Sequence, residues 1–197
     1  LGEHLSCGVV GKRARCVALG KNLIVQAAAN HSYCDLRIVV LCEQEETAQW
    51  EFCRWLPHCW DEGHTARLIA NTPETIRALL ERLEPVFSAR AAAGQNAGLG
   101  AAPRAKPWYL FVCAAPETVT QHAFMKFLTA NRRELGISVL YLFDRIDLLP
   151  EECHDILDCR EAAGVLFERR HASRKQPFQP EQVPQARYEQ FARSMAP

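Results

Sequence analysis

The 197-residue sequence lacks an excess of charge of either sign. It has 23 basic residues against 23 acidic ones, so its overall field gives no reason to expect binding to nucleic acid or to an anionic membrane surface. It also lacks an apolar run long enough to cross a bilayer, and it shows no signal peptide. Because it starts at Leu1 rather than Met, we expect a fragment of a longer protein.

A disulfide framework is also lacking, although nine cysteines are present. Their number is odd, and most lie within apolar segments, which predicts buried free thiols in a reducing cytoplasm. Cys53, His58, Cys59 and His64 could in principle hold zinc. The two cysteines are not spaced like common zinc pairs, so we expect them to pack in the core and expect no bound metal.

The sequence also lacks an intact phosphate loop, and this absence is the most informative one. The segment from Leu5 to Ala29 passes from an apolar run through a glycine turn into helical spacing, which is how a nucleotide-binding α/β domain begins. A working loop has two glycines separated by four residues, followed by Lys and a Ser or Thr. Here Gly8 and Gly11 enclose only two residues, and Lys12 is followed by Arg13. The magnesium-binding hydroxyl is therefore missing from this candidate phosphate site.

A second element of nucleotide hydrolysis is missing further along. In phosphate-loop hydrolases a later buried strand ends in a carboxylate that completes the magnesium site. The strand expected at residues 108–113 is followed by Ala114, Ala115 and Pro116, and the first carboxylate is Glu117. We therefore predict no catalytic residues and no cofactor. The alternative is a weakly active enzyme that binds ATP and magnesium through the Gly8–Lys12 turn.

The alternation of strands and helices predicts the fold class. We expect one α/β domain over residues 1–197, a three-layer phosphate-loop or RecA-like fold with a mainly parallel central sheet and helices on both faces. The Ala- and Gly-rich residues 91–106 predict a mobile surface loop. Strands of the parallel core are expected at residues 6–10, 36–42, 66–70, 108–113, 137–143 and 164–168. Helices are expected from the glycine turn to Ala29, at residues 45–56, from Pro73 with an apolar face that runs to Phe87, and at residues 118–135 and 150–156. A last helix is expected around Tyr188, Phe191, Ala192 and Met195, with its end near Ala196.

Two aspartates follow the fifth expected strand. Asp144 and Asp147 lie where open α/β sheets place ligands, beyond the carboxyl ends of the strands. In the alternative function they would assist Lys12. The simpler interpretation is that they cap the turn and the short helix after it.

Several segments together resemble one family. They are WLPHCW (residues 55–60), RLIANTPE (67–74), LEP (83–85), ELGISVL (134–140) and LPEEC (149–153). In this order they closely resemble the domain that precedes the first motor domain of EssC-type proteins, the membrane-bound FtsK/SpoIIIE-like ATPases of type VII secretion systems. The resemblance covers nearly the whole chain. It departs at Cys59 and in the Ala- and Gly-rich loop before Trp108.

The resemblance implies a role and a location. Such a domain is a degenerate ATPase-like unit between membrane helices and motor domains, on the cytoplasmic side of the cell membrane. The implied function is non-hydrolysing coupling in protein export. Its partners would be the adjacent motor and membrane domains, further copies in a homo-oligomer and other secretion components, with no nucleic acid. No catalytic residue is carried over, because the hydrolysis motif has no matching positions.

Overall fold

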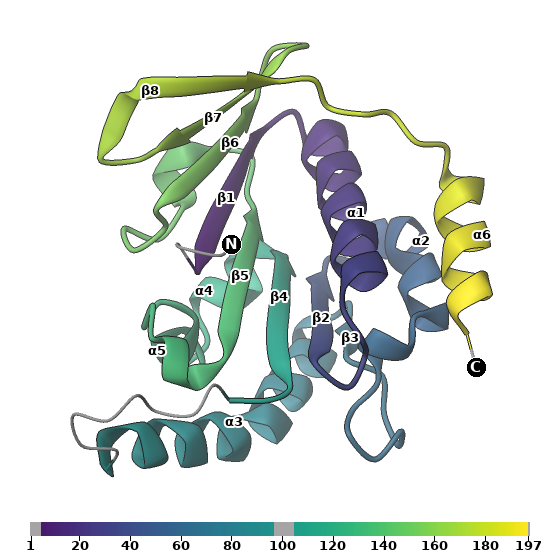
Figure 1. Ribbon diagram of the computed structural model, residues 1–197, viewed down its shortest axis with the longest axis vertical. Coiled ribbons are helices and arrows are strands. Elements are labelled where there is room, and N and C mark those ends of the chain that lie inside the picture. The colour runs from purple at the N-terminus through teal and green to yellow at the C-terminus, as the bar shows by residue number, and fades with distance from the viewer. Residues whose placement is uncertain (1–4, 97–104, 197) are drawn as a thin grey trace.

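The computed structural model describes residues 5–96 and 105–196 as one twisted sheet between two layers of helices (Figure 1). The strand order is β3-β2-β4-β5-β1-β6-β7-β8. The strands are β1 (Ser6–Gly11), β2 (Leu36–Cys42), β3 (Ile69–Ala70), β4 (Trp108–Ala114), β5 (Ile137–Leu142), β6 (Asp155–Cys159), β7 (Gly164–Glu168) and β8 (His171–Phe178). The helices are α1 (Arg13–Asn30), α2 (Thr47–Trp50), α3 (Pro73–Asn96), α4 (Pro116–Thr120), α5 (Met125–Leu128) and α6 (Gln185–Met195).

The predicted fold class is confirmed by the sheet. Neighbouring strands from β3 to β6 all pair in parallel, whereas β7 and β8 pair antiparallel. Strands β1, β2 and β5 are buried along their whole length. Such continuous apolar runs are typical of strands that are covered on both faces.

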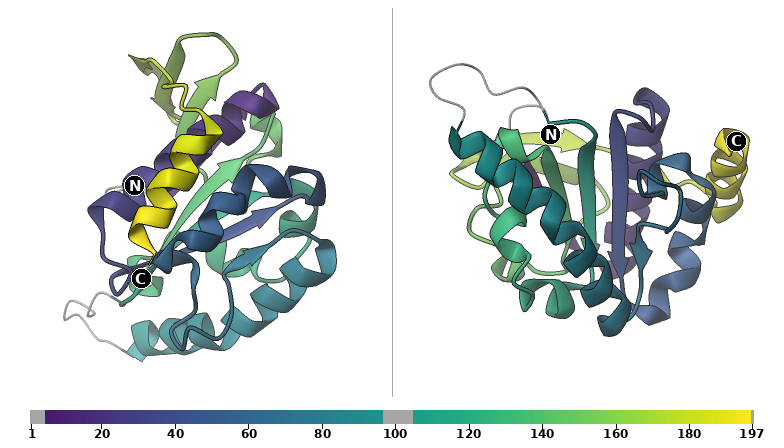
Figure 2. Two further views of the ribbon diagram at one scale, coloured as in Figure 1. Left: turned by 90° about the vertical axis from the view of Figure 1, so that its right-hand side faces the viewer. Right: turned by 90° about the horizontal axis from the view of Figure 1, so that it is seen from below.

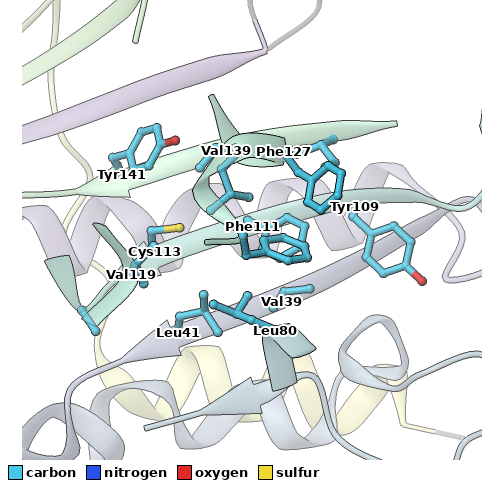
Figure 3. Close-up of a cluster of buried hydrophobic side chains, with 14 of the residues drawn as sticks. Val39, Leu41, Leu80, Tyr109, Phe111, Cys113, Val119, Phe127, Val139 and Tyr141 are labelled. Atoms are coloured by element: carbon cyan, nitrogen blue, oxygen red, sulfur yellow. The ribbon is translucent and has the colours of Figure 1, made fainter. Parts of the chain in front are cut away.

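Helices cover both faces of the sheet (Figure 2). Helices α1 and α6 pack on one face together with the short helical segments after β2, and α3, α4 and α5 pack on the other. The second face holds an aromatic cluster around Phe87, Phe111 and Phe124, whose ring centroids lie 5.5–5.8 Å apart. Figure 3 shows how Phe111 and Tyr109 of β4 lie among Val39, Leu80 and Phe127 on this face. No helix in the described ranges is long and apolar enough to cross a bilayer.

The end of the chain differs most from the prediction. The helix expected at residues 150–156 is wrong, because this segment leads into β6, which extends the parallel sheet beside β1. The strand expected at residues 164–168 exists as β7, but it is antiparallel and lies outside the parallel core. Strand β8 was not predicted. Its residues are exposed except at Phe178, so they lack the apolar signal of a covered strand.

Several helical segments are also shorter than predicted. The helix expected at residues 118–135 is broken into α4, α5 and the 3-10 turn η4 (Arg133–Leu135), and Asn131, whose φ of +48° does not fit a helix, lies between α5 and η4. Residues 44–55 form the 3-10 turns η1 (Gln44–Glu46) and η2 (Glu51–Trp55) around the single turn of α2. The expected strand at residues 66–70 shortens to β3.

The predicted loop at residues 91–106 is wrong at its start. Helix α3 continues through Asn96, six residues into the segment that was expected to be a loop. Residues 97–104 lie outside the described residues. The high helix propensity of consecutive alanines accounts for the longer helix.

Candidate functional site

The junction between β1 and α1 is a single residue. Strand β1 ends at Gly11, Lys12 has an extended backbone, and α1 begins at Arg13. Gly8 lies within the strand, where it pairs with Tyr141 of β5 and Ile156 of β6. The four predicted site residues thus do not form a loop. They run from inside a strand to the first turn of a helix.

Both glycines have structural reasons of their own. A methyl group on Gly8 would collide with the side chain of Leu149 and lie 3.2 Å from Cys153 Sγ. Gly11 has φ +140°, and a methyl group there would lie 2.7 Å from the carbonyl carbon of Cys159. Glycine at position 11 therefore allows a backbone conformation that other residues rarely adopt, next to the end of β6.

The Arg13 guanidinium lies at the carboxyl ends of the central strands. Its Nη1 donates a hydrogen bond to Leu142 O at the end of β5 (2.6 Å), and its Nη2 donates to Ala114 O at the end of β4. Its Nε and Nη2 also donate to the two carboxylate oxygens of Glu46, with an Nη2–Oε2 distance of 2.6 Å. These four bonds use most of the donors of the guanidinium.

Arg13 and Glu46 form a largely buried, bidentate ion pair. Their side chains are only 27% and 18% exposed. Burial acts to lower the pKa of Arg13, but the hydrogen bonds and the charge of Glu46 outweigh it, so the pKa is raised above its ordinary value. Bidentate arginine–carboxylate pairs are among the strong polar contacts in proteins. The guanidinium is therefore fixed as a permanent cation against the strand ends.

Acidic side chains surround this pair. Glu43 and Glu45 follow β2, Glu117 follows β4, and Asp144 follows β5; all four are exposed. Burial raises the pKa of Glu43, Arg13 opposes this shift, and the charges of Glu46, Glu45 and Glu117 add to it. The carboxyl edge of the sheet therefore presents several exposed carboxylates around one internally paired arginine.

The other predicted site residues, Lys12, Asp144 and Asp147, lie in different surroundings. Lys12 is exposed. Asp144 joins the Arg13 group, since its Oδ1 lies 3.8 Å from Arg13 Nη1 and its carbonyl oxygen accepts the N–H of Gly11. Asp147 instead pairs with Arg145, which lowers the pKa of this carboxyl. Asp147 lies inside a short 3-10 turn, η5 (Ile146–Leu148), which begins after Arg145 and has no side-chain cap, so the capping role expected for Asp147 is wrong.

The four possible zinc ligands separate into different environments. Cys53 and Cys59 lie in the core cluster that includes the buried face of α1, and burial raises the pKa of Cys53. His58 is buried with its Nε2 2.8 Å from His31 O, and His64 is exposed beside Trp60. Residues 5–96 and 105–196 contain no group of three or more suitable side chains that could hold a metal ion. That the protein binds no metal stays a prediction.

His58 gives a prediction for pH dependence. Burial is the main cause that lowers its pKa, opposed by the hydrogen bond to the His31 carbonyl. The folded state thus favours the neutral ring, so its contribution to stability is full above the unfolded pKa of about 6.5 and is lost as the pH falls through and below that value. We expect the unfolding free energy of His58→Gln to fall less between pH 7 and pH 5 than that of the parent chain. His64→Gln, at an exposed position that forms no ion pair with a carboxylate of the described residues, serves as the control, and equal losses in all three proteins would contradict the assignment to His58.

Sequence reasoning missed Glu46. A signal was present, because the acidic run Glu43, Glu45 and Glu46 directly follows an expected parallel strand and must lie at the same edge as the first turn. Nothing in the spacing indicated which of these carboxylates would reach Arg13, 33 positions earlier in the chain.

Comparisons with known proteins identify related sequences. No protein-family model matches the chain. It is 25% identical over 194 residues to the ESX secretion system protein EccC of Geobacillus thermodenitrificans, a match that covers 98% of this chain and 13% of that protein. It is 23% identical over 196 residues to the type VII secretion system protein EssC of Staphylococcus aureus strain NCTC 8325, with the same coverage. The chain thus spans about an eighth of the length of these relatives.

Solved structures share the fold. ATPases 2 and 3 of EssC from Geobacillus thermodenitrificans match 96% of this chain, and the match spans 44% of that chain, with a TM-score of 0.64 and 9% identity. The cytoplasmic domain of the Thermomonospora curvata type VII secretion ATPase EccC matches 97% of this chain, and the match spans 28% of that chain, with a TM-score of 0.63 and 14% identity. These likenesses confirm a RecA-like α/β fold. Together with the sequence matches they lead to one conclusion: over 98% of its length, this chain is homologous to the EssC/EccC ATPases of type VII secretion systems.

Proposed function

We propose that this chain is a non-hydrolysing, ATPase-like module of a type VII secretion ATPase that couples its membrane anchor to the downstream motor domains during protein export. The observation that carries the proposal is the Arg13–Glu46 ion pair at the carboxyl ends of β4 and β5. A cation that is already bound to a carboxylate and two carbonyl oxygens has few donors left for a phosphate.

The requirements of phosphoryl transfer support a site that does not hydrolyse nucleotide. A working site needs successive N–H groups around the β-phosphate, a lysine on the outer phosphates, a hydroxyl on magnesium and a carboxylate at a strand end. Here the turn is a single residue, the position of the hydroxyl is Arg13, and β4 ends at Ala114. The acidic side chains around Arg13 add repulsion toward a nucleotide.

The comparisons support the placement within the longer protein. The chain is 25% identical to EccC of Geobacillus thermodenitrificans but only 9% identical to ATPases 2 and 3 of EssC from the same organism. This difference supports a position outside those two motor domains, such as the one before the first motor domain. The proposed location is the cytoplasmic side of the membrane, with partners in the adjacent domains of the same chain, in further copies of it and in other secretion components.

Hydrolysis assays on the purified chain test whether this site hydrolyses ATP. We expect magnesium-dependent ATP turnover at the background rate, and we expect Lys12→Ala to change neither the turnover nor the unfolding midpoint, because Lys12 is exposed at a one-residue junction. The rival function is a weakly active nucleotide-binding enzyme that uses Lys12. It would be supported by turnover above background that Lys12→Ala abolishes.

Coupling itself is tested in the longer protein that carries this chain. Deletion of residues 5–196 should leave ATP hydrolysis by the motor domains measurable and should stop export. Export that continues at the normal rate after the deletion would contradict a coupling role.

A further inference from the structure

Strand β8 leaves one long edge of the sheet unpaired. It is the last strand in the sheet order, it is eight residues long, and it pairs only with β7 (Figure 1). The strand at the other end of the sheet, β3, has only two residues. Beyond its pairing with β7, β8 forms no backbone hydrogen bond with any residue in the ranges 5–96 and 105–196. Such an edge presents a row of free N–H and C=O groups on which a further strand can pair.

The edge of β8 lies at the surface. Residues 171–177 are all exposed, and only the last residue of the strand, Phe178, is half-buried, where it packs against Gly164 of β7. Pro177 has no N–H group and cannot donate to a neighbouring strand. The part of the edge that is open to a partner strand therefore consists of residues 171–176.

This edge carries an excess of positive charge. Residues 169–180 include three arginines and one lysine and no carboxylate, although the chain as a whole has 23 basic and 23 acidic residues. Arg174 and Lys175 are exposed within β8, and neither forms an ion pair with a carboxylate of the described ranges. They are consecutive in a strand, so they lie on opposite faces of the sheet.

These charges select among the possible occupants of the edge. A second copy of β8 would bring like charges together, which disfavours pairing between two copies of the chain. A nucleic acid or an anionic membrane would meet the charges but would leave the backbone groups of the edge unpaired. An extended protein segment with carboxylate side chains matches both features, because its backbone pairs with β8 and its carboxylates meet Arg174 and Lys175.

We propose that residues 171–176 of β8 bind an extended acidic segment of a partner protein, which adds a strand to the sheet. The backbone of β8 holds the segment, and Arg174 and Lys175 select one that carries carboxylates. This surface shares no residue with the Arg13–Glu46 ion pair, so it stands or falls separately from the proposed coupling function.

An acidic peptide titrated into the purified chain tests this surface by NMR. The probe is a blocked peptide of alternating Val and Glu, as long as the edge of residues 171–176, and the control peptide has Lys in place of Glu. At low ionic strength, we expect the acidic peptide to shift the backbone amide resonances of residues 171–176. It should also slow hydrogen exchange at those amides of β8 that exchange rapidly in the free chain, because they become paired. The lysine peptide should do neither.

Two double variants with the same change in net charge sharpen the test. Arg174→Glu combined with Lys175→Glu should weaken binding of the acidic peptide by about tenfold or more and should allow the lysine peptide to bind. Arg77→Glu combined with Arg187→Glu reverses two charges at exposed positions of α3 and α6 and should leave binding of the acidic peptide unchanged.

Four results would overturn the proposal. If neither peptide binds, the charges of β8 serve only to keep the edge unpaired. If the acidic peptide binds without slowing amide exchange, it meets the charges alone, as a nucleic acid or an anionic membrane would. The proposal also fails if both double variants bind the acidic peptide like the parent, or if the chain without peptide dimerises through β8.

Discussion

Arg13→Met is expected to lower the free energy of unfolding by about 2–4 kcal/mol. The substitution leaves the Glu46 carboxylate, which is 18% exposed, without its partner, and it removes the donors to Leu142 O and Ala114 O. Methionine keeps much of the volume of the side chain, so most of the loss comes from the unpaired polar groups. Chemical denaturation measures the effect, with one common value for the slope of unfolding free energy against denaturant concentration.

A second variant separates the ion pair from packing. Glu46→Gln added to Arg13→Met should recover part of the loss, because a neutral amide costs less to leave partly buried than an unpaired carboxylate. Arg54→Met is the matched control, since its pair with Glu51 is exposed, with side-chain exposures of 57% and 46%. We expect less than about 1 kcal/mol there. A loss of similar size in Arg13→Met and Arg54→Met would show that Arg13 is an ordinary surface arginine.

Gly11→Ala is expected to destabilise the fold by about 3 kcal/mol or more. The new methyl group would lie 2.7 Å from the carbonyl carbon of Cys159 and 2.9 Å from the Arg160 nitrogen, at a residue with φ +140°. Because the colliding atoms belong to the backbone of β6 and the residue after it, they cannot move away by a change of rotamer. Thermal or chemical unfolding of the purified chain gives the measurement.

Gly63→Ala is the matched control for Gly11→Ala. Gly63 lies in the exposed loop after η3 (Pro57–Cys59), and a methyl group there would meet the side chain of Thr65 at ordinary contact distances, 3.5 Å from Cγ2 and 4.0 Å from Oγ1. We expect a change within about 0.5 kcal/mol. If Gly11→Ala were equally mild, the glycine would not be needed for the approach of β6, and a role in binding a ligand would regain weight.

The central strands of the parallel sheet could be predicted because each of them is a covered apolar run. The residues of β2, β4 and β5 are nearly all apolar and buried, so composition alone identifies them. Strand β6 begins with Asp155 and contains Asp158, and β8 is exposed and charged, so neither carries that signal. Their pairing depends on contacts between strands, which local periodicity does not encode.

The sequence predicted at which edge of the sheet the candidate site lies, but not which side chains pair there. The sequence indicates that Gly11, Arg13 and Asp144 must meet at the carboxyl edge, since parallel strands end on the same side of a sheet. The partner of Arg13 could not be predicted, because Glu43, Glu45 and Glu46 are equivalent in sequence and the choice depends on the 3-10 turn η1.

Thermal unfolding at increasing concentrations of magnesium-ATP tests the central claim. This claim is that the Arg13–Glu46 ion pair prevents a nucleotide from binding at the carboxyl ends of the strands. A ligand present at a hundred times its dissociation constant stabilises a protein by about 2.7 kcal/mol, so even weak binding is measurable at high millimolar nucleotide. The account predicts the same unfolding midpoint with and without magnesium-ATP, in the parent chain and in Lys12→Ala alike. A saturable rise of the midpoint in the parent chain that Lys12→Ala removes would contradict it.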